Sequence, residues 1–182
     1  MNKVSICQPN GNFRPVLPTT LCPNPLKAVV EEIPDPSCPH KMYRVGYSPQ
    51  HPPVFFEVYR SCYDVDTMTA HFSIHLVHNK RLVVPRPEQG FTSDRIFPAA
   101  DAVSFQNRII NQRFVDIFGT QQTYMPQNEL IFARGHLAPV GDFVFEKDIR
   151  LTSKYINVVA QFASINNQMD VQNSPGRQPR AL

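Results

Sequence analysis

The sequence contains no long apolar run and no signal-peptide pattern. No stretch approaches the roughly 18 apolar residues that a membrane-spanning helix needs, so we expect a soluble protein without a membrane partner. The first residues lack the basic, apolar and small-residue succession of an export signal, so the chain is either intracellular or begins after, or without, such a signal. Its 182 residues suffice for one domain with a sizeable core, or for a core domain plus an irregular segment.

The chain also has little net charge. Its formal charge is +3, and two of the basic residues without nearby acids, Arg177 and Arg180, lie in the last few positions. This balance neither indicates nor excludes a nucleic-acid-binding protein, because a local basic groove can lie on a nearly neutral surface.

Cysteine is scarce and confined to the first third of the chain. The four cysteines are Cys7, Cys22, Cys38 and Cys62. None belongs to a CxxC pair, which argues against a zinc site. An even number in Pro-rich sequence predicts one or two disulfides with Cys22 or Cys38 bonded, and therefore an oxidising compartment. Three pairings remain open for two bonds, and four buried free thiols are the alternative.

Proline separates the chain into two parts. Most of the 18 prolines lie in residues 1–53, where we expect turns and extended pieces. From Val54 onward, residues 54–65 and 67–78 are rich in β-branched and aromatic residues, which predicts two strands. We therefore divide the chain into a Pro- and Cys-rich segment (1–53), a core (54–170) and an irregular tail (171–182).

The remaining core favours an α+β fold, an antiparallel sheet with packed helices. Apolar residues at helical spacing predict an amphipathic helix over 101–120, ended by Gly119. Other segments are predicted as a loop at 85–100, a strand at 129–137, a loop at 138–147 and a strand at 155–162.

Three histidines lie close together in the second predicted strand. His71 and His75 are roughly 13 Å apart by strand rise, too far for one ion, so we interpret them and His78 as solvent-facing strand positions. Arg81, Arg86 and Arg95 follow this strand. They either line a phosphate-binding groove or are scattered surface charges.

The most informative motif is Arg134-Gly135-His136 at the end of an apolar strand. A lone histidine is more often structural, but its neighbours here favour chemistry. Gly135 permits close backbone approach, and Arg134 offers a guanidinium suited to phosphate. The step to Pro139 begins a loop, so the imidazole lies at a strand end that substrate can reach.

The stretch from Ala133 to Pro139, followed by VVAQF and Asn166, resembles the signature of the DNA/RNA non-specific endonucleases. This is the His-Me finger (ββα-metal) class, which includes the Serratia-type nuclease, endonuclease G and secreted arthropod nucleases. The likeness is closest to the arthropod proteins and extends from about Phe55 to Asn167.

The resemblance implies a sugar-nonspecific nuclease that cleaves DNA and RNA through backbone contacts. In it, His136 is the general base, Asn166 is the protein ligand of Mg²⁺ or another hard ion such as Mn²⁺, and Arg134 orients the loop or contacts phosphate. The resemblance also implies a secreted protein. The sequence yields no prediction of oligomeric state.

The sequence departs from the family pattern in three places. Ala133 replaces the usual Asp, and Ala160-Gln161 replaces Pro-Gln. After Asn167 the family continues into a helix with a Glu, whereas this chain has Ser174 there, so we expect a truncated C-terminal part. A ligand on a frayed tail loses preorganisation. The alternative function is therefore an impaired, nuclease-like protein that only binds nucleic acid.

Overall fold

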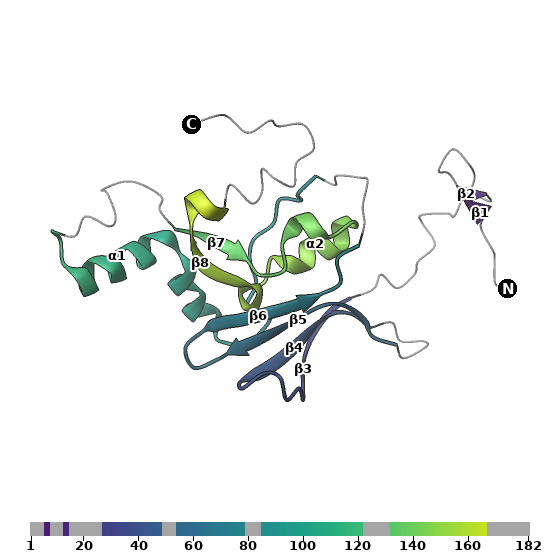
Figure 1. Cartoon of the computed structure of the whole chain (residues 1–182), viewed down its shortest axis with the longest axis horizontal. Helices are drawn as coiled ribbons and strands as arrows, with labels where there is room; N and C mark the ends of the chain where they lie inside the picture. The colour runs from purple at the N-terminus through teal and green to yellow at the C-terminus, as the bar shows by residue number, and fades with distance from the viewer. Residues whose placement is uncertain are drawn as a thin grey trace.

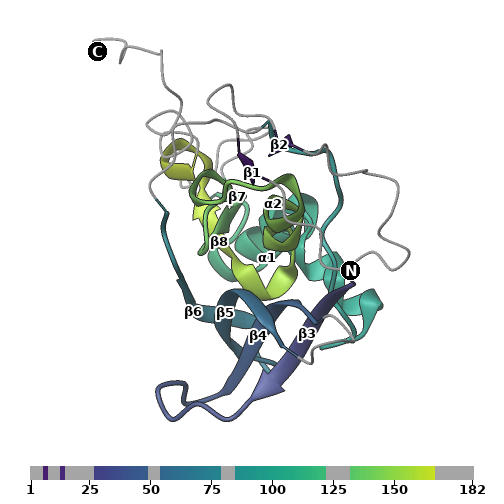
Figure 2. The same cartoon turned by 90° about the vertical axis from the view of Figure 1, so that its right-hand side faces the viewer.

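The computed structural model describes residues 6–7, 13–14, 27–48, 54–78, 85–121 and 132–166. They form an α+β fold in which a layer of short helices and a β-hairpin covers one face of an antiparallel sheet (Figures 1 and 2). The predicted fold class is therefore confirmed. No helix of the described residues is long and apolar enough to cross a membrane. The predictions for Cys22, Arg81 and the tail at 171–182 concern residues outside the described ranges.

Four antiparallel strands form the main sheet in the order β3, β4, β5, β6. They span Ala28–Ile33, Lys41–Tyr47, Phe56–Asp64 and Thr69–His75. The two strands predicted from Val54 onward are confirmed as β5 and β6. Strands β3 and β4 lie within the Pro-rich segment, and neither contains proline, because the prolines fall between and around them. Two short strands, β1 (Ile6–Cys7) and β2 (Phe13–Arg14), form a separate antiparallel pair.

A β-bulge interrupts the pairing of β5 with β6. Cys62 lies opposite Phe72 and Tyr63 opposite Ala70, so His71 has no opposite residue. One extra residue reverses the alternation of faces. Beyond the bulge the side chains of Ser73 and His75 therefore turn toward the covering layer, where they bond to Asn157 and Asp142. The interpretation of His75 as a solvent-facing position is wrong for this reason.

The inner face of the sheet packs against α2 (Glu146–Thr152) and the 3₁₀ helix η3 (Tyr155–Asn157). Polar groups of β4 and β5 attach this layer to the sheet. The Tyr47 hydroxyl donates to the Lys147 carbonyl, Tyr59 donates to Leu151, and the Ser61 hydroxyl donates to Ile156. These bonds connect buried strand residues directly to the backbone that precedes the second hairpin strand.

The opposite face of the sheet carries a smaller buried cluster around a disulfide. Cys38 and Cys62 are bonded with their Cα atoms 5.5 Å apart, and Met42 packs beside them. The prediction that Cys22 or Cys38 forms a disulfide is confirmed for Cys38. The bond ties the segment before β4 to the last part of β5.

The remaining elements differ in detail from the prediction. The predicted helix at 101–120 is divided into η1 (Ala99–Phe105) and α1 (Asn107–Phe118), because the backbone at Gln106 is extended. Gly119 ends α1 with φ 81°, as predicted. Strands β7 (Phe132–His136) and β8 (Val158–Phe162) form a hairpin, although residues 155–157, predicted as strand, form η3. The predicted loop after Ala138 contains η2 (Val140–Asp142) and leads directly into α2.

Candidate active site

His136 is the last residue of β7 and lies opposite Val158 of β8. Close approach of the two strands depends on Gly135. A Cβ atom at that position would overlap the side chain of Gln161 in β8. Glycine therefore leaves room for the Gln161 side chain against β7, next to the residue that precedes His136.

The imidazole of His136 lies in a buried and electropositive environment. Its Nε2 atom is buried and has no hydrogen-bond partner among the described residues. Burial, followed by the positive charges of Arg86 and Arg134, lowers the pKa of His136 from 6.5 to about 4. At neutral pH the ring is therefore uncharged, and one of its nitrogens carries an unprotonated lone pair.

Arg134 is held beside His136 through an aromatic ring. Its guanidinium carbon lies 4.6 Å from the centroid of the Phe91 ring, and the same ring is 5.5 Å from the imidazole of His136. Such a cation–π contact orients a guanidinium without neutralising it. Within the described part of the chain, no carboxylate forms an ion pair with Arg134 or Arg86. Both charges are thus available to an anion.

The loop that carries Phe91 is tied to the segment before β8. The Thr92 amide donates to the Ser153 carbonyl (3.2 Å), and the Tyr155 amide donates to the Thr92 carbonyl (3.0 Å). Lys154, whose side chain is 7% exposed, forms an ion pair of 2.6 Å with Asp94. These contacts fix the ring of Phe91 between His136 and Tyr155.

Asn157 positions the backbone that follows His136, a role that the sequence analysis missed. The side chain is fully buried. Its Oδ1 accepts from the Ala138 amide (2.8 Å) and the Ser73 hydroxyl (3.1 Å), and its Nδ2 donates to the carbonyls of Ala138 (3.1 Å) and Thr152 (3.0 Å). The Leu137 amide donates to the Asn157 carbonyl. One asparagine therefore connects the loop after β7 to β6 and α2.

Comparison with known proteins assigns this hairpin to a family. The model of the DNA/RNA non-specific endonucleases matches residues 38–174. The chain belongs to the DNA/RNA non-specific endonuclease family. A salivary endonuclease of Lutzomyia longipalpis is 29% identical over 137 residues, which cover 73% of this chain and 33% of that protein. The chain thus spans about a third of the length of this curated relative. No solved structure matches it.

The other residues singled out by the endonuclease resemblance lie on or after the same hairpin. Asn166 is half-buried on a helical turn at 163–166 that directly follows β8, so two strands and a helix succeed one another. Ala133, which replaces the family's Asp, lies in β7 opposite Gln161. Ser174 lies outside the described residues.

The arginines and histidines in and after β6 that the sequence singled out separate into different groups. Arg86 is near enough to His136 to lower its pKa. Arg95 is exposed, in a left-handed backbone conformation with φ 64°. His75 Nε2 lies 2.8 Å from Asp142 Oδ2, with its ring against Phe143. The structure therefore gathers His136, Arg134 and Arg86 and gives His75 a separate partner.

Proposed function

We propose that this chain hydrolyses phosphodiester bonds in DNA and RNA with the help of a divalent cation, Mg²⁺ or another hard ion such as Mn²⁺. The observation that carries the proposal is the state of His136. Its imidazole is neutral, its Nε2 is buried without a partner among the described residues, and the charges acting on it come from two arginines. Attack of water on a phosphodiester anion requires an uncharged base to accept the water proton and positive charge to stabilise the anion.

His136 is the proton acceptor in this proposal. With its own proton on Nδ1, the Nε2 lone pair takes a proton from a water molecule as the water oxygen bonds to phosphorus and the bond to the 3′ oxygen breaks. The low pKa keeps the free imidazole unprotonated. A bound phosphodiester brings negative charge beside the ring, which raises this pKa and strengthens the base when substrate is present.

Arg134 and Arg86 bind the non-bridging phosphate oxygens in the proposed mechanism. A guanidinium presents paired donors that match phosphate geometry, and Phe91 keeps that of Arg134 beside the base. Contacts of this kind read the backbone and not the base edges, so they do not distinguish DNA from RNA or one sequence from another.

Asn166 is the residue that would hold the divalent ion. Its amide oxygen is a hard donor of the kind that magnesium prefers, and a single protein ligand leaves positions for water and phosphate. Asn166 itself is half-buried on the helical turn directly after β8, so its side chain starts next to the hairpin. A bound ion would polarise a phosphoryl oxygen and stabilise the charge on the leaving 3′ oxygen.

The test separates cleavage from binding. The purified chain, with its disulfide intact, is incubated with supercoiled plasmid DNA and with double-stranded RNA, in magnesium and in chelator. We expect both substrates to be cut in magnesium and neither in chelator. Fluorescence anisotropy in chelator measures binding alone. Binding without cleavage in any divalent ion supports the alternative of a nuclease-like binding protein, and absence of both contradicts the proposed function.

We also propose that the protein acts outside the cell. The relative is named a salivary endonuclease, and the Cys38–Cys62 disulfide is typical of an oxidising compartment. In chain recovered from the medium of exporting cells, mass spectrometry without reductant should find the two cysteines in one linked peptide. Complete alkylation of both under those conditions would contradict this localisation.

A further inference from the structure

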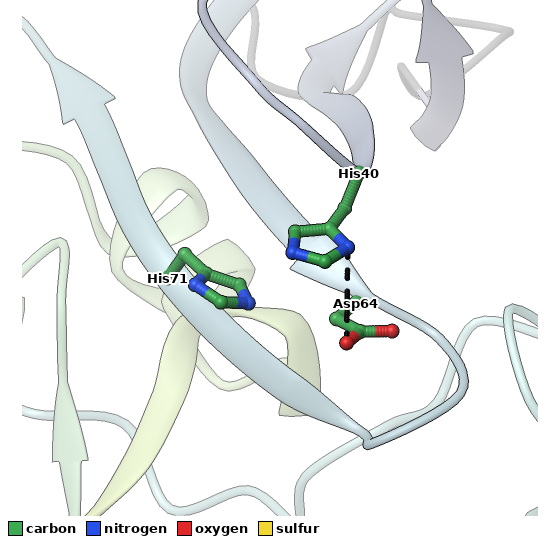
Figure 3. Close-up of side chains that lie close together, drawn as sticks. All are labelled: His40, Asp64 and His71. Carbon is green, nitrogen blue, oxygen red and sulfur yellow. Dashed lines mark ion pairs between the residues drawn. The ribbon is translucent and has the colours of Figure 1, made fainter.

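A second group of chemically active side chains lies on the main sheet, on elements other than the β7–β8 hairpin. His40 directly precedes β4, Asp64 ends β5, and His71 is the bulged residue of β6. Figure 3 shows the His71 ring extending toward the other two side chains and the ion pair that joins His40 to Asp64. One ligand atom from each of the three residues lies within 4.8 Å of the others.

The distances within this group suit a shared ion better than direct bonding. His40 Nδ1 is 3.7 Å from Asp64 Oδ2, beyond a hydrogen bond, and the rings of His40 and His71 stack with centroids 4.4 Å apart. Ligand atoms around a tetrahedral zinc ion with bonds of 2.0–2.1 Å lie about 3.3 Å from one another. Coordination therefore requires side-chain rotations that turn the two stacked rings so that one nitrogen of each faces the ion.

The backbone holds all three residues in place. Lys41 pairs with Tyr63, so the preceding His40 comes beside Asp64, and the Cys38–Cys62 disulfide joins the same two segments two residues earlier. The bulge in β6 redirects His71. Asp64 accepts from the Asp66 amide (2.9 Å) and the Thr67 hydroxyl (2.8 Å), which fixes its carboxylate and leaves acceptor positions unused.

We propose that His40, Asp64 and His71 bind one zinc ion, or a divalent ion of similar softness, that stabilises this end of the sheet. Two imidazoles with one carboxylate favour zinc, copper or nickel over magnesium. Three protein ligands leave a fourth position for water. The ion joins the start of β4, the end of β5 and the bulge of β6.

The experiment measures zinc binding directly on the full, metal-free chain with its disulfide oxidised and no reductant present. Zinc chloride is titrated against a chromophoric chelator in excess magnesium. We expect one zinc ion to bind per chain. In His40→Gln and in His71→Gln the zinc affinity should fall roughly 10–100-fold or more, because even the loss of a residue that only hydrogen-bonds to a metal ligand costs that much. His78→Gln, an exposed histidine on the residues after β6, is the matched control and should bind as the unchanged chain does.

Two further measurements distinguish zinc binding at this group from binding at the nuclease site and from a change in folding. His136→Gln should retain full zinc affinity. Zinc should raise the Tm of the unchanged chain but not that of His40→Gln, while the two have equal Tm without metal, since His40 is exposed. Asp64→Asn keeps an acceptor for the turn and should still lose affinity. Absence of zinc binding, or loss of it in His136→Gln and not in His40→Gln, overturns the proposal.

Discussion

The histidine of the β7–β8 hairpin and the two histidines beside Asp64 have opposite surroundings. His136 is flanked by Arg86 and Arg134, and its buried Nε2 has no partner among the described residues. His40 and His71 are exposed and lie next to a carboxylate. Burial, aided by cationic neighbours, lowers the pKa of His136 and keeps the imidazole neutral, whereas a carboxylate beside exposed imidazoles builds a site for a cation. The surroundings therefore suit His136 to accept a proton, and suit His40 and His71 to bind a cation.

The two groups are also positioned by different means. Hydrogen bonds of the buried Asn157 side chain hold the loop that follows His136. The pairing of β4 with β5, a surface turn and a disulfide position His40 and Asp64. Substitutions at one group should therefore leave the other unchanged, and the predictions below test this separation.

The largest effect is expected for His136→Ala. Loss of the proton acceptor should lower kcat/KM for plasmid cleavage by about 10²–10⁴-fold, the usual contribution of general base catalysis. His78→Ala, an exposed histidine, serves as the control and should cleave normally. Undiminished cleavage by freshly purified His136→Ala protein would rule out the assigned role.

Asn157→Ala should cause the next largest change, in stability as well as activity. It leaves the Ala138 amide and carbonyl without their buried partners, at a cost of about 3 kcal/mol in the free energy of unfolding. Urea unfolding measures this cost. Ser73→Ala removes a single bond to the same side chain and should cost about 1 kcal/mol. Equal effects of the two variants would show that Asn157 does not organise the loop.

The sequence predicted the elements whose evidence is local. Strands β5 and β6, the end of α1 at Gly119 and the strand that ends with the Arg134-Gly135-His136 motif follow from apolar spacing and turn residues. The helix α2 was missed because its seven residues provide two apolar positions, Ile149 and Leu151, too few for a periodic signal.

Features set by distant residues were not predictable in this way. The inward direction of His75 results from the bulge at His71, which depends on how β6 pairs with β5. The role of Asn157 depends on backbone groups 5 and 19 residues away. His40 and His71 meet only because both flank Asp64 on adjacent strands, and no spacing along the chain indicates such a meeting. The hypotheses for His136 and Asn166 came from the family resemblance, which rests on a long, ordered match along the chain.

Asn166→Ala should weaken magnesium binding at the cleavage site without changing the group of His40, Asp64 and His71. We expect the magnesium concentration for half-maximal cleavage to rise roughly 10–100-fold, in line with losses seen when a metal site is weakened. Ser164→Ala is the control, because Ser164 is exposed on the same helical turn. Zinc binding measured by chelator competition should be unchanged in both variants. An unaltered magnesium requirement would remove Asn166 from the proposed site.

The smallest effect concerns the protonation of His136 itself. The pKa of His136 is lowered to about 4 from 6.5, first by burial and then by Arg86 and Arg134. Between these two pH values the unfolded chain binds a proton that the folded chain does not, so this group makes folding less stable as pH falls from 6.5 toward 4. The ring signal of His136, assigned by its absence in His136→Ala, should therefore titrate near pH 4 in an NMR series.

Arg86→Gln removes one of the two cations, and its His136 signal should titrate at higher pH, though still below 6.5 because burial remains. Arg95→Gln, an exposed arginine, should leave the midpoint unchanged. A midpoint at 6.5 in the unchanged chain would show that His136 is hydrated like an exposed histidine, and the contrast with His40 and His71 would then be lost.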